Sequence, residues 1–64
     1  MAKYNVTVSL TEVDGNAFSV MGAVKKALRR HGVKKEELDE YTKQATSGDY
    51  DNLLRVTMEW VEVL

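Results

Sequence analysis

The sequence predicts a small α+β domain in which one N-terminal strand precedes three helices and an extended C-terminal tail. Two patterns carry this prediction: apolar residues recur with a period of two near the N-terminus and at helical spacing afterwards. The chain has 64 residues, 44% apolar and 30% charged, with no cysteine and no proline. This composition is typical of a single folded domain, spanning 1–64, whose small core has no disulfide to support it.

Residues 3–11 alternate between apolar and polar as a half-buried strand does. The apolar residues of its inner face are Tyr4, Val6, Val8 and Leu10. Residues 12–15 include an Asp-Gly pair and therefore predict a turn between this strand and the first helix.

The segment 16–33 predicts an amphipathic helix with both of its ends marked. Asp14 and Asn16 are candidate N-caps, and Gly32 supplies the left-handed residue that ends the helix. The expected buried face consists of Ala17, Val20, Met21, Val24, Ala27 and Leu28. The opposite face carries Lys25, Lys26, Arg29 and Arg30.

A second, shorter helix is predicted over about 35–46, with Leu38, Tyr41 and Ala45 on a narrow apolar stripe. If Lys34 is its N-cap, Glu37 takes the capping-box position three residues later. Lysine is a poor N-cap, so this helix start is the weakest of the three.

Residues 49–61 fit two secondary structures. As a helix, the segment gathers its charges on one narrow arc and places Arg55 and Glu59 as an i,i+4 pair. As a strand over 54–63, apolar and polar residues alternate about as well, which gives a β-α-α-β arrangement. The helix separates the charges better, so we predict a helix and then an extended tail that pairs with the first strand.

Positive charge is concentrated in one part of a chain whose net charge is −1, because six of the nine basic residues lie between positions 25 and 35. Such a surface can order a head-to-tail contact, attract an anionic ligand or bind the backbone of a nucleic acid. The candidate partner-binding residues are Tyr4, Lys25, Lys26, Arg29, Arg30 and Tyr41. The alternative interpretation is a solvated helix face whose charges pair with the acidic second helix.

Two loops that precede helices combine glycine with small polar residues, as anion sites at helix N-termini do. The candidate anion-binding residues are Gly15, Asn16, Ser47 and Gly48. Neither loop matches a Walker or dinucleotide motif, and Asp14 and Asp49 would repel an anion. The alternative interpretation is a pair of turns that cap the helices without a ligand.

Residues that carry covalent chemistry are scarce. His31 is the only histidine and falls in the last turn of the first helix, where helix capping explains it. Without cysteine or a second histidine, neither a metal set nor an activated nucleophile can be assembled, so we expect no metal, no cofactor and no enzymatic activity. The chain has no apolar run that spans a bilayer and no secretory signal, so we expect a cytoplasmic protein without a membrane partner.

The blocks DGNAF (14–18), ATSGDYDNLL (45–54) and MEWVEV (58–63) resemble a group of short bacterial and bacteriophage proteins that have no assigned activity. The resemblance covers nearly the whole chain and implies a phage-linked accessory protein. We therefore expect a non-enzymatic module that assists or inhibits a host macromolecule by stoichiometric binding.

Two further expectations concern partners. The open sheet edge and the small core predict a homodimer or a higher homo-oligomer. The alternative functions are sequestration of a nucleotide-like anion by the two glycine loops, and weak nucleic-acid binding through the basic helix face, which lacks the aromatic residues that stack on bases.

Overall fold

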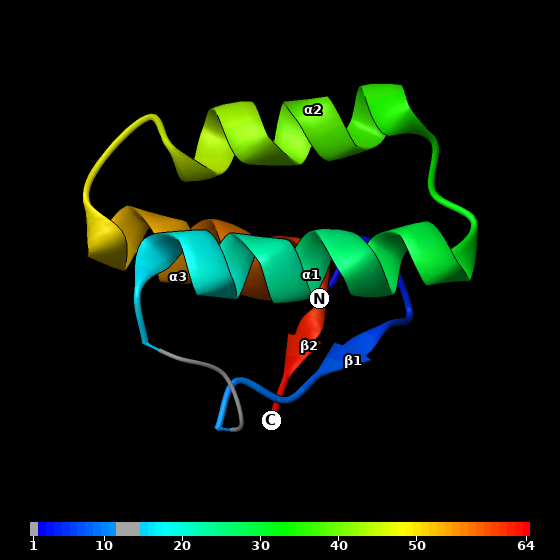
Figure 1. Cartoon of the computed structure of the whole chain (residues 1–64), viewed down its shortest axis with the longest axis horizontal. Coiled ribbons are helices and arrows are strands. Elements are labelled where there is room, and N and C mark those ends of the chain that lie inside the picture. The colour runs from blue at the N-terminus through cyan, green and yellow to red at the C-terminus, as the bar shows by residue number, and fades with distance from the viewer. Residues whose placement is uncertain (1, 12–14) are drawn as a thin grey trace.

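In the computed structural model, which describes residues 2–11 and 15–64, three helices lie between two short strands in the chain order β1-α1-α2-α3-β2. The predicted α+β class is thus confirmed. Helix α2 (Lys35–Ala45) lies on one side of the pair formed by α1 (Ala17–His31) and α3 (Tyr50–Trp60), and the strands lie on the other side (Figure 1). Figure 1 also shows β1 and β2, from opposite ends of the sequence, side by side.

Helix α1 has the ends that the sequence predicts. The Asn16 side chain accepts a hydrogen bond of 2.8 Å from the Ser19 N–H, and Gly32 adopts a left-handed conformation with φ of 99°. The N–H groups of Gly32 and Val33 then donate to the carbonyls of Arg29 and Leu28, which is a Schellman motif. The predicted turn over 12–15 and the proposed capping role of Asp14 fall largely outside the described residues.

Helix α2 begins without a side-chain cap. Lys34 is the N-cap residue, and its side chain makes no capping hydrogen bond. The capping box expected from Glu37 does not form among the described residues, because the Glu37 carboxylate accepts hydrogen bonds from the N-terminal segment instead. The expectation that Lys34 is a poor cap agrees with this missing bond, and the role expected for Glu37 is wrong.

The segment 50–60 is a helix, so the alternative strand over 54–63 is wrong. Asp49 caps α3 by accepting a hydrogen bond from the Asn52 N–H. The expected Arg55–Glu59 ion pair is absent from the described part of the chain, where the Arg55 guanidinium donates to the Asn52 side chain at 2.8 Å.

Strand β1 (Thr7–Val8) pairs in parallel with β2 (Glu62–Val63), with Thr7 opposite Glu62. The prediction that the C-terminal tail pairs with the first strand is confirmed, but the predicted strand over 3–11 is too long. Strand β1 is short because its partner β2 is short. The segment before β1 makes other hydrogen bonds, in which the N–H groups of Lys3 and Tyr4 donate to the carbonyls of Glu59 and Trp60. These carbonyls at the end of α3 lack helical partners, so the N-terminal segment caps α3.

The core lies where the strands meet the three helices. The alternation predicted for the first strand holds, since Val6 and Val8 are buried while Tyr4 and Leu10 pack against the core. The buried apolar residues are Val6, Val8, Val20, Met21, Val24, Leu28, Tyr41, Ala45, Leu53, Val56, Trp60 and Val61. Every element of the fold contributes to this set except β2, whose Val63 packs against it.

Candidate functional site

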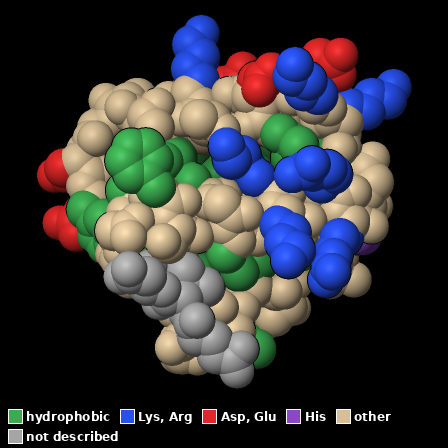
Figure 2. All heavy atoms as spheres, viewed as in Figure 1, with side chains coloured by type: hydrophobic (Ala, Val, Ile, Leu, Met, Phe, Trp, Pro, Cys, Tyr) green, Lys and Arg blue, Asp and Glu red, His purple; other side chains and the backbone are tan. Residues whose placement is uncertain are grey.

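Helix α1, the loop after it and the first residue of α2 present a continuous cationic surface, which we call the basic surface. Its residues are Lys25, Lys26, Arg29, Arg30, Lys34 and Lys35. Five of these residues are exposed and Lys25 is partly buried. In Figure 2 the Lys and Arg side chains gather over the right half of the face shown and along its top edge, where Asp and Glu side chains lie beside them.

The basic surface lacks the ion pairs that the solvated-face interpretation expected from the acidic second helix. Within the described residues, the only ion pair joins Lys3 to Glu37, at 2.9 Å. Helix α2 carries four acidic residues, yet no carboxylate among the described residues lies within 4.0 Å of a cation of this surface. The positive charge is therefore open to an external anion or acidic group.

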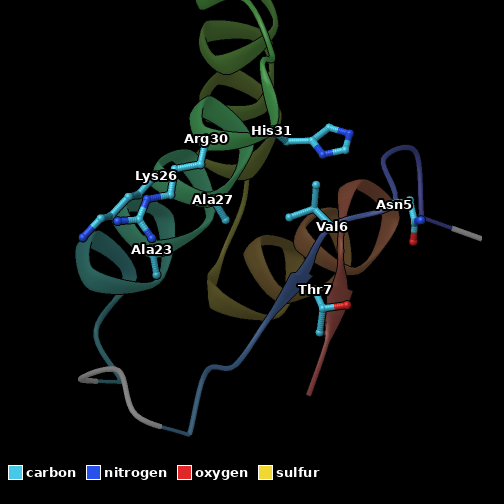
Figure 3. A pocket seen from close by; sticks show the side chains of 8 residues that line it. All are labelled: Asn5, Val6, Thr7, Ala23, Lys26, Ala27, Arg30 and His31. Carbon is cyan, nitrogen blue, oxygen red and sulfur yellow. The ribbon is translucent and has the colours of Figure 1, made fainter.

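Two hollows border the basic surface. The first lies between α1 and the segment 5–7, has a volume of about 500 Å³, and is lined by Lys26, Arg30 and His31 together with Ala23 and Ala27. Figure 3 shows the two alanines on the side of α1 that faces β1, with Lys26 and Arg30 extending from the same helix. The short alanine side chains leave the space between helix and strand unfilled.

The second hollow lies between α1 and α2. Its charged lining residues are Lys25, Arg29 and Lys35 together with Asp39 of α2, whose carboxylate forms no ion pair with them. Val33 and Leu38 form its apolar wall. The two hollows thus divide the basic surface, so that Lys26 and Arg30 line one of them and Lys25 and Arg29 line the other.

The tyrosines proposed as partner-binding residues are not free surface groups. Tyr41 is 0% exposed, which makes its proposed partner-binding role wrong. Its place on the apolar stripe of α2 brings the ring into the core, where it meets the Trp60 ring edge-on at 5.7 Å. Tyr4 is partly buried between the rings of His31 and Trp60, at 6.3 and 5.9 Å. Tyr4 therefore packs the end of α1 against the end of α3.

Glu37 joins the N-terminal segment to α2. Its carboxylate accepts hydrogen bonds from the Tyr4 hydroxyl at 2.8 Å and from the Lys3 ammonium at 2.9 Å. The Lys3 hydrogen bond lowers the pKa of Glu37, and the Tyr4 hydrogen bond lowers it further. The Lys3 ammonium also lies 4.3 Å from the centre of the Trp60 ring, a cation–π contact. Sequence reasoning missed this cluster, because its members lie far apart in the chain.

The two glycine loops lie next to each other, and their polar side chains cap the helices that follow. The Tyr50 hydroxyl donates to the Gly15 carbonyl at 2.7 Å, and this bond joins the start of α3 to the start of α1. The Asn16 and Asp49 side chains already accept N–H groups at these helix starts, and the Ser47 hydroxyl donates to the Gln44 carbonyl. These contacts favour the capping interpretation, since the Asn16, Ser47 and Asp49 side chains bond to backbone groups of the chain itself.

A third hollow lies between these loops and is mainly apolar. Ala17, Phe18, Met21 and Leu53 contribute to its lining, and Asp49 is its only charged lining residue among those described. Phe18, although part of α1, is 84% exposed there. This chemistry does not suit a phosphate, because a carboxylate faces the space and the described lining contains no cation.

His31 lies in the last turn of α1, exposed, with its ring against Tyr4. Within residues 2–11 and 15–64, no three histidine or carboxylate side chains gather in a way that could hold a metal ion. No helix in the described part of the chain is both long and apolar enough to cross a bilayer.

No family model, curated protein or solved structure matches this chain.

Proposed function

We propose that this protein is a non-enzymatic binding module whose basic surface captures an acidic region of a partner protein in a stoichiometric complex. The observation that carries the proposal is the absence, within the described residues, of any ion pair to the six cations of this surface. Such a cluster repels itself in the free protein, and an acidic partner relieves that repulsion.

The proposal also rests on how charged surfaces work in complexes. Complementary charge accelerates association and rejects partners of the wrong sign, and these effects do not require a large interface. Arginine is well suited to the task because its planar guanidinium binds a carboxylate through two parallel hydrogen bonds. Arg29 and Arg30 are both exposed and lie on different sides of the surface, next to different hollows.

The resemblance to short bacterial and bacteriophage proteins extends this proposal. It makes the chain a phage-linked accessory or inhibitory protein of the cytoplasm that acts on a host protein. The small core supports self-association as a homodimer or higher homo-oligomer. Catalysis has no part in the proposal, because the chain contains no cysteine and a single histidine.

The test compares two double charge reversals of equal size. Arg29→Glu with Arg30→Glu alters the basic surface, whereas Lys43→Glu with Arg55→Glu alters exposed cations on α2 and α3. Each protein serves as bait in host lysate with and without nuclease, and each is titrated with an oligoglutamate peptide.

The proposal expects nuclease-resistant capture of acidic proteins, and a loss of peptide affinity of about tenfold or more in the first variant only. Equal affinity in the two variants would contradict it. Capture that disappears with nuclease would assign the surface to nucleic acid instead.

A further inference from the structure

Strand β1 has one edge that pairs with no other strand in the described part of the chain. The Val6 carbonyl accepts a hydrogen bond from the Glu62 N–H at 2.8 Å, and the Val8 carbonyl accepts one from the Leu64 N–H at 3.0 Å. Backbone groups of alternate residues point to opposite edges of a strand, so the N–H and C=O of Thr7 point away from β2. Thr7 has no backbone hydrogen-bond partner among the described residues.

This open edge lies beside the first hollow. Thr7 and Val6 line one side of the hollow, and Ala23 and Ala27 of α1 lie on the other. Figure 3 shows β1 running past the face of α1 that carries these alanines. The volume of about 500 Å³ next to unpaired backbone groups provides room for an extended segment of chain.

The edge also differs from the protected edges of most sheets, which carry a charge, a proline or a bulge on the strand itself. The outward residues of the β1 region, Thr7 and Ser9, are uncharged and small. Positive charge lies instead across the hollow, on Lys26 and Arg30. If two copies paired β1 to β1, these cations would be brought together, so the arrangement opposes self-pairing and favours an acidic strand.

From these observations we infer that the outer edge of β1 binds an extended, acidic segment of the partner protein by strand addition. The inference rests on the proposed function and names the form of the partner. The backbone of the segment bonds to Thr7, and affinity from main-chain hydrogen bonds is typical of this mode of recognition.

The alternation of side chains along a strand defines what the segment contains. Every second side chain projects to the same face as Val6, into the hollow and toward α1. There the two alanines leave space, and Lys26 and Arg30 supply the positive charge. The structure therefore favours glutamate or aspartate at alternate positions, with residues of high strand propensity between them.

The experiment uses the whole chain, which is short enough for chemical synthesis, with N-methyl-threonine at position 7. This change removes the outward N–H and places a methyl group on the edge, and it leaves the β1–β2 hydrogen bonds intact. The probe is a peptide in which glutamate and valine alternate, and a lysine–valine peptide is the control ligand. Thr7→Val in the same chain is the matched control, because it changes the side chain and keeps the backbone.

We expect the glutamate peptide to bind the unmodified chain and Thr7→Val equally, and to lose about tenfold or more in affinity with N-methyl-Thr7. In the unmodified chain, hydrogen exchange of the Thr7 amide slows when the peptide is added. Lys26→Glu with Arg30→Glu weakens binding more than Lys25→Glu with Arg29→Glu, because only the first pair faces the hollow beside β1.

Three outcomes would overturn the inference. Unchanged affinity with N-methyl-Thr7, together with an unprotected Thr7 amide, would leave the basic surface as the binding site without strand addition. If the lysine–valine peptide bound as tightly as the glutamate–valine peptide, the bound segment would not need to be acidic. Self-association of the unmodified chain that N-methyl-Thr7 abolishes would assign the edge to a second copy. In each case the proposed function is judged separately, by the Arg29/Arg30 reversal.

Discussion

The hydroxyls of Tyr41 and Thr57 lie 2.7 Å apart in the middle of the core. Both residues are 0% exposed, and Thr57 is the one buried polar residue among those described. Since Tyr41 belongs to α2 and Thr57 to α3, the bond fixes how the two helices pack. Burial also raises the pKa of Tyr41, and either of the two hydroxyls can be the donor.

Thr57→Val should destabilise the domain by about 1–3 kcal/mol, because the Tyr41 hydroxyl is then buried without a partner. Tyr41→Phe should cost less, since the Thr57 hydroxyl can turn to a carbonyl of its own helix. The double variant should be more stable than the sum of the two single effects predicts. Urea unfolding of the four proteins measures this coupling, and additive effects would contradict the role of the pair.

Glu37 should make stability sensitive to acid. Its pKa is lowered in the folded state, so the folded protein binds fewer protons than the unfolded chain as the pH passes below about 4. The stabilisation is complete above the unfolded pKa and is lost as the pH falls through the lowered folded value. Glu37→Gln should therefore flatten the acid limb of a plot of unfolding free energy against pH. Glu36→Gln, at the exposed neighbouring position, should leave that limb in place.

Gly32 and Gly22 should respond to alanine with opposite signs. Gly32 ends α1 with φ of 99°, a conformation that alanine adopts only with strain, so Gly32→Ala should cost about 1 kcal/mol. Gly22 lies inside α1, and a Cβ there meets no atom within 4 Å, so Gly22→Ala should stabilise by up to about 1 kcal/mol. Thermal unfolding of both variants measures the difference, and a shift of the same sign in both would refute it.

Lys34→Ser should stabilise the domain by about 0.5–1 kcal/mol, because serine supplies the side-chain acceptor that α2 lacks at its N-cap. Lys34 has the extended backbone of an N-cap residue, so the substitution needs no rearrangement. Lys34→Gln is the matched control, since it removes the charge without adding a short acceptor. Equal stability of the two variants would show that charge, rather than capping, limits this helix start.

Local patterns predicted the helices because their determinants lie close together in the sequence. Asn16 and Gly32 mark the ends of α1 through contacts within a few residues, and Asp49 does the same for α3. The basic surface follows from helical spacing in the same way. These features need no knowledge of the tertiary structure.

Contacts between distant segments could not be predicted in this way. The alternation over 3–11 identified a buried face, but the short partner at β2 limits the ladder to Thr7 and Val8. The local sequence around Glu37 predicts a capping box. Its carboxylate instead accepts hydrogen bonds from Lys3 and Tyr4, which are distant in the sequence. Tyr41 was proposed as a surface residue, although its position on the apolar stripe of α2 already indicated burial.

The parallel pairing of β1 with β2 has a consequence for how the protein is made. The ribosome delivers β1 first, whereas its partner strand β2 and the buried residues of α3 come last among the described elements. Before β2 is made, Val6 and Val8 have no partner strand, and the apolar face of α1 lacks the buried residues of α3 that pack against it. The sheet and much of the core therefore depend on contacts between distant segments, which form more slowly than contacts within one helix.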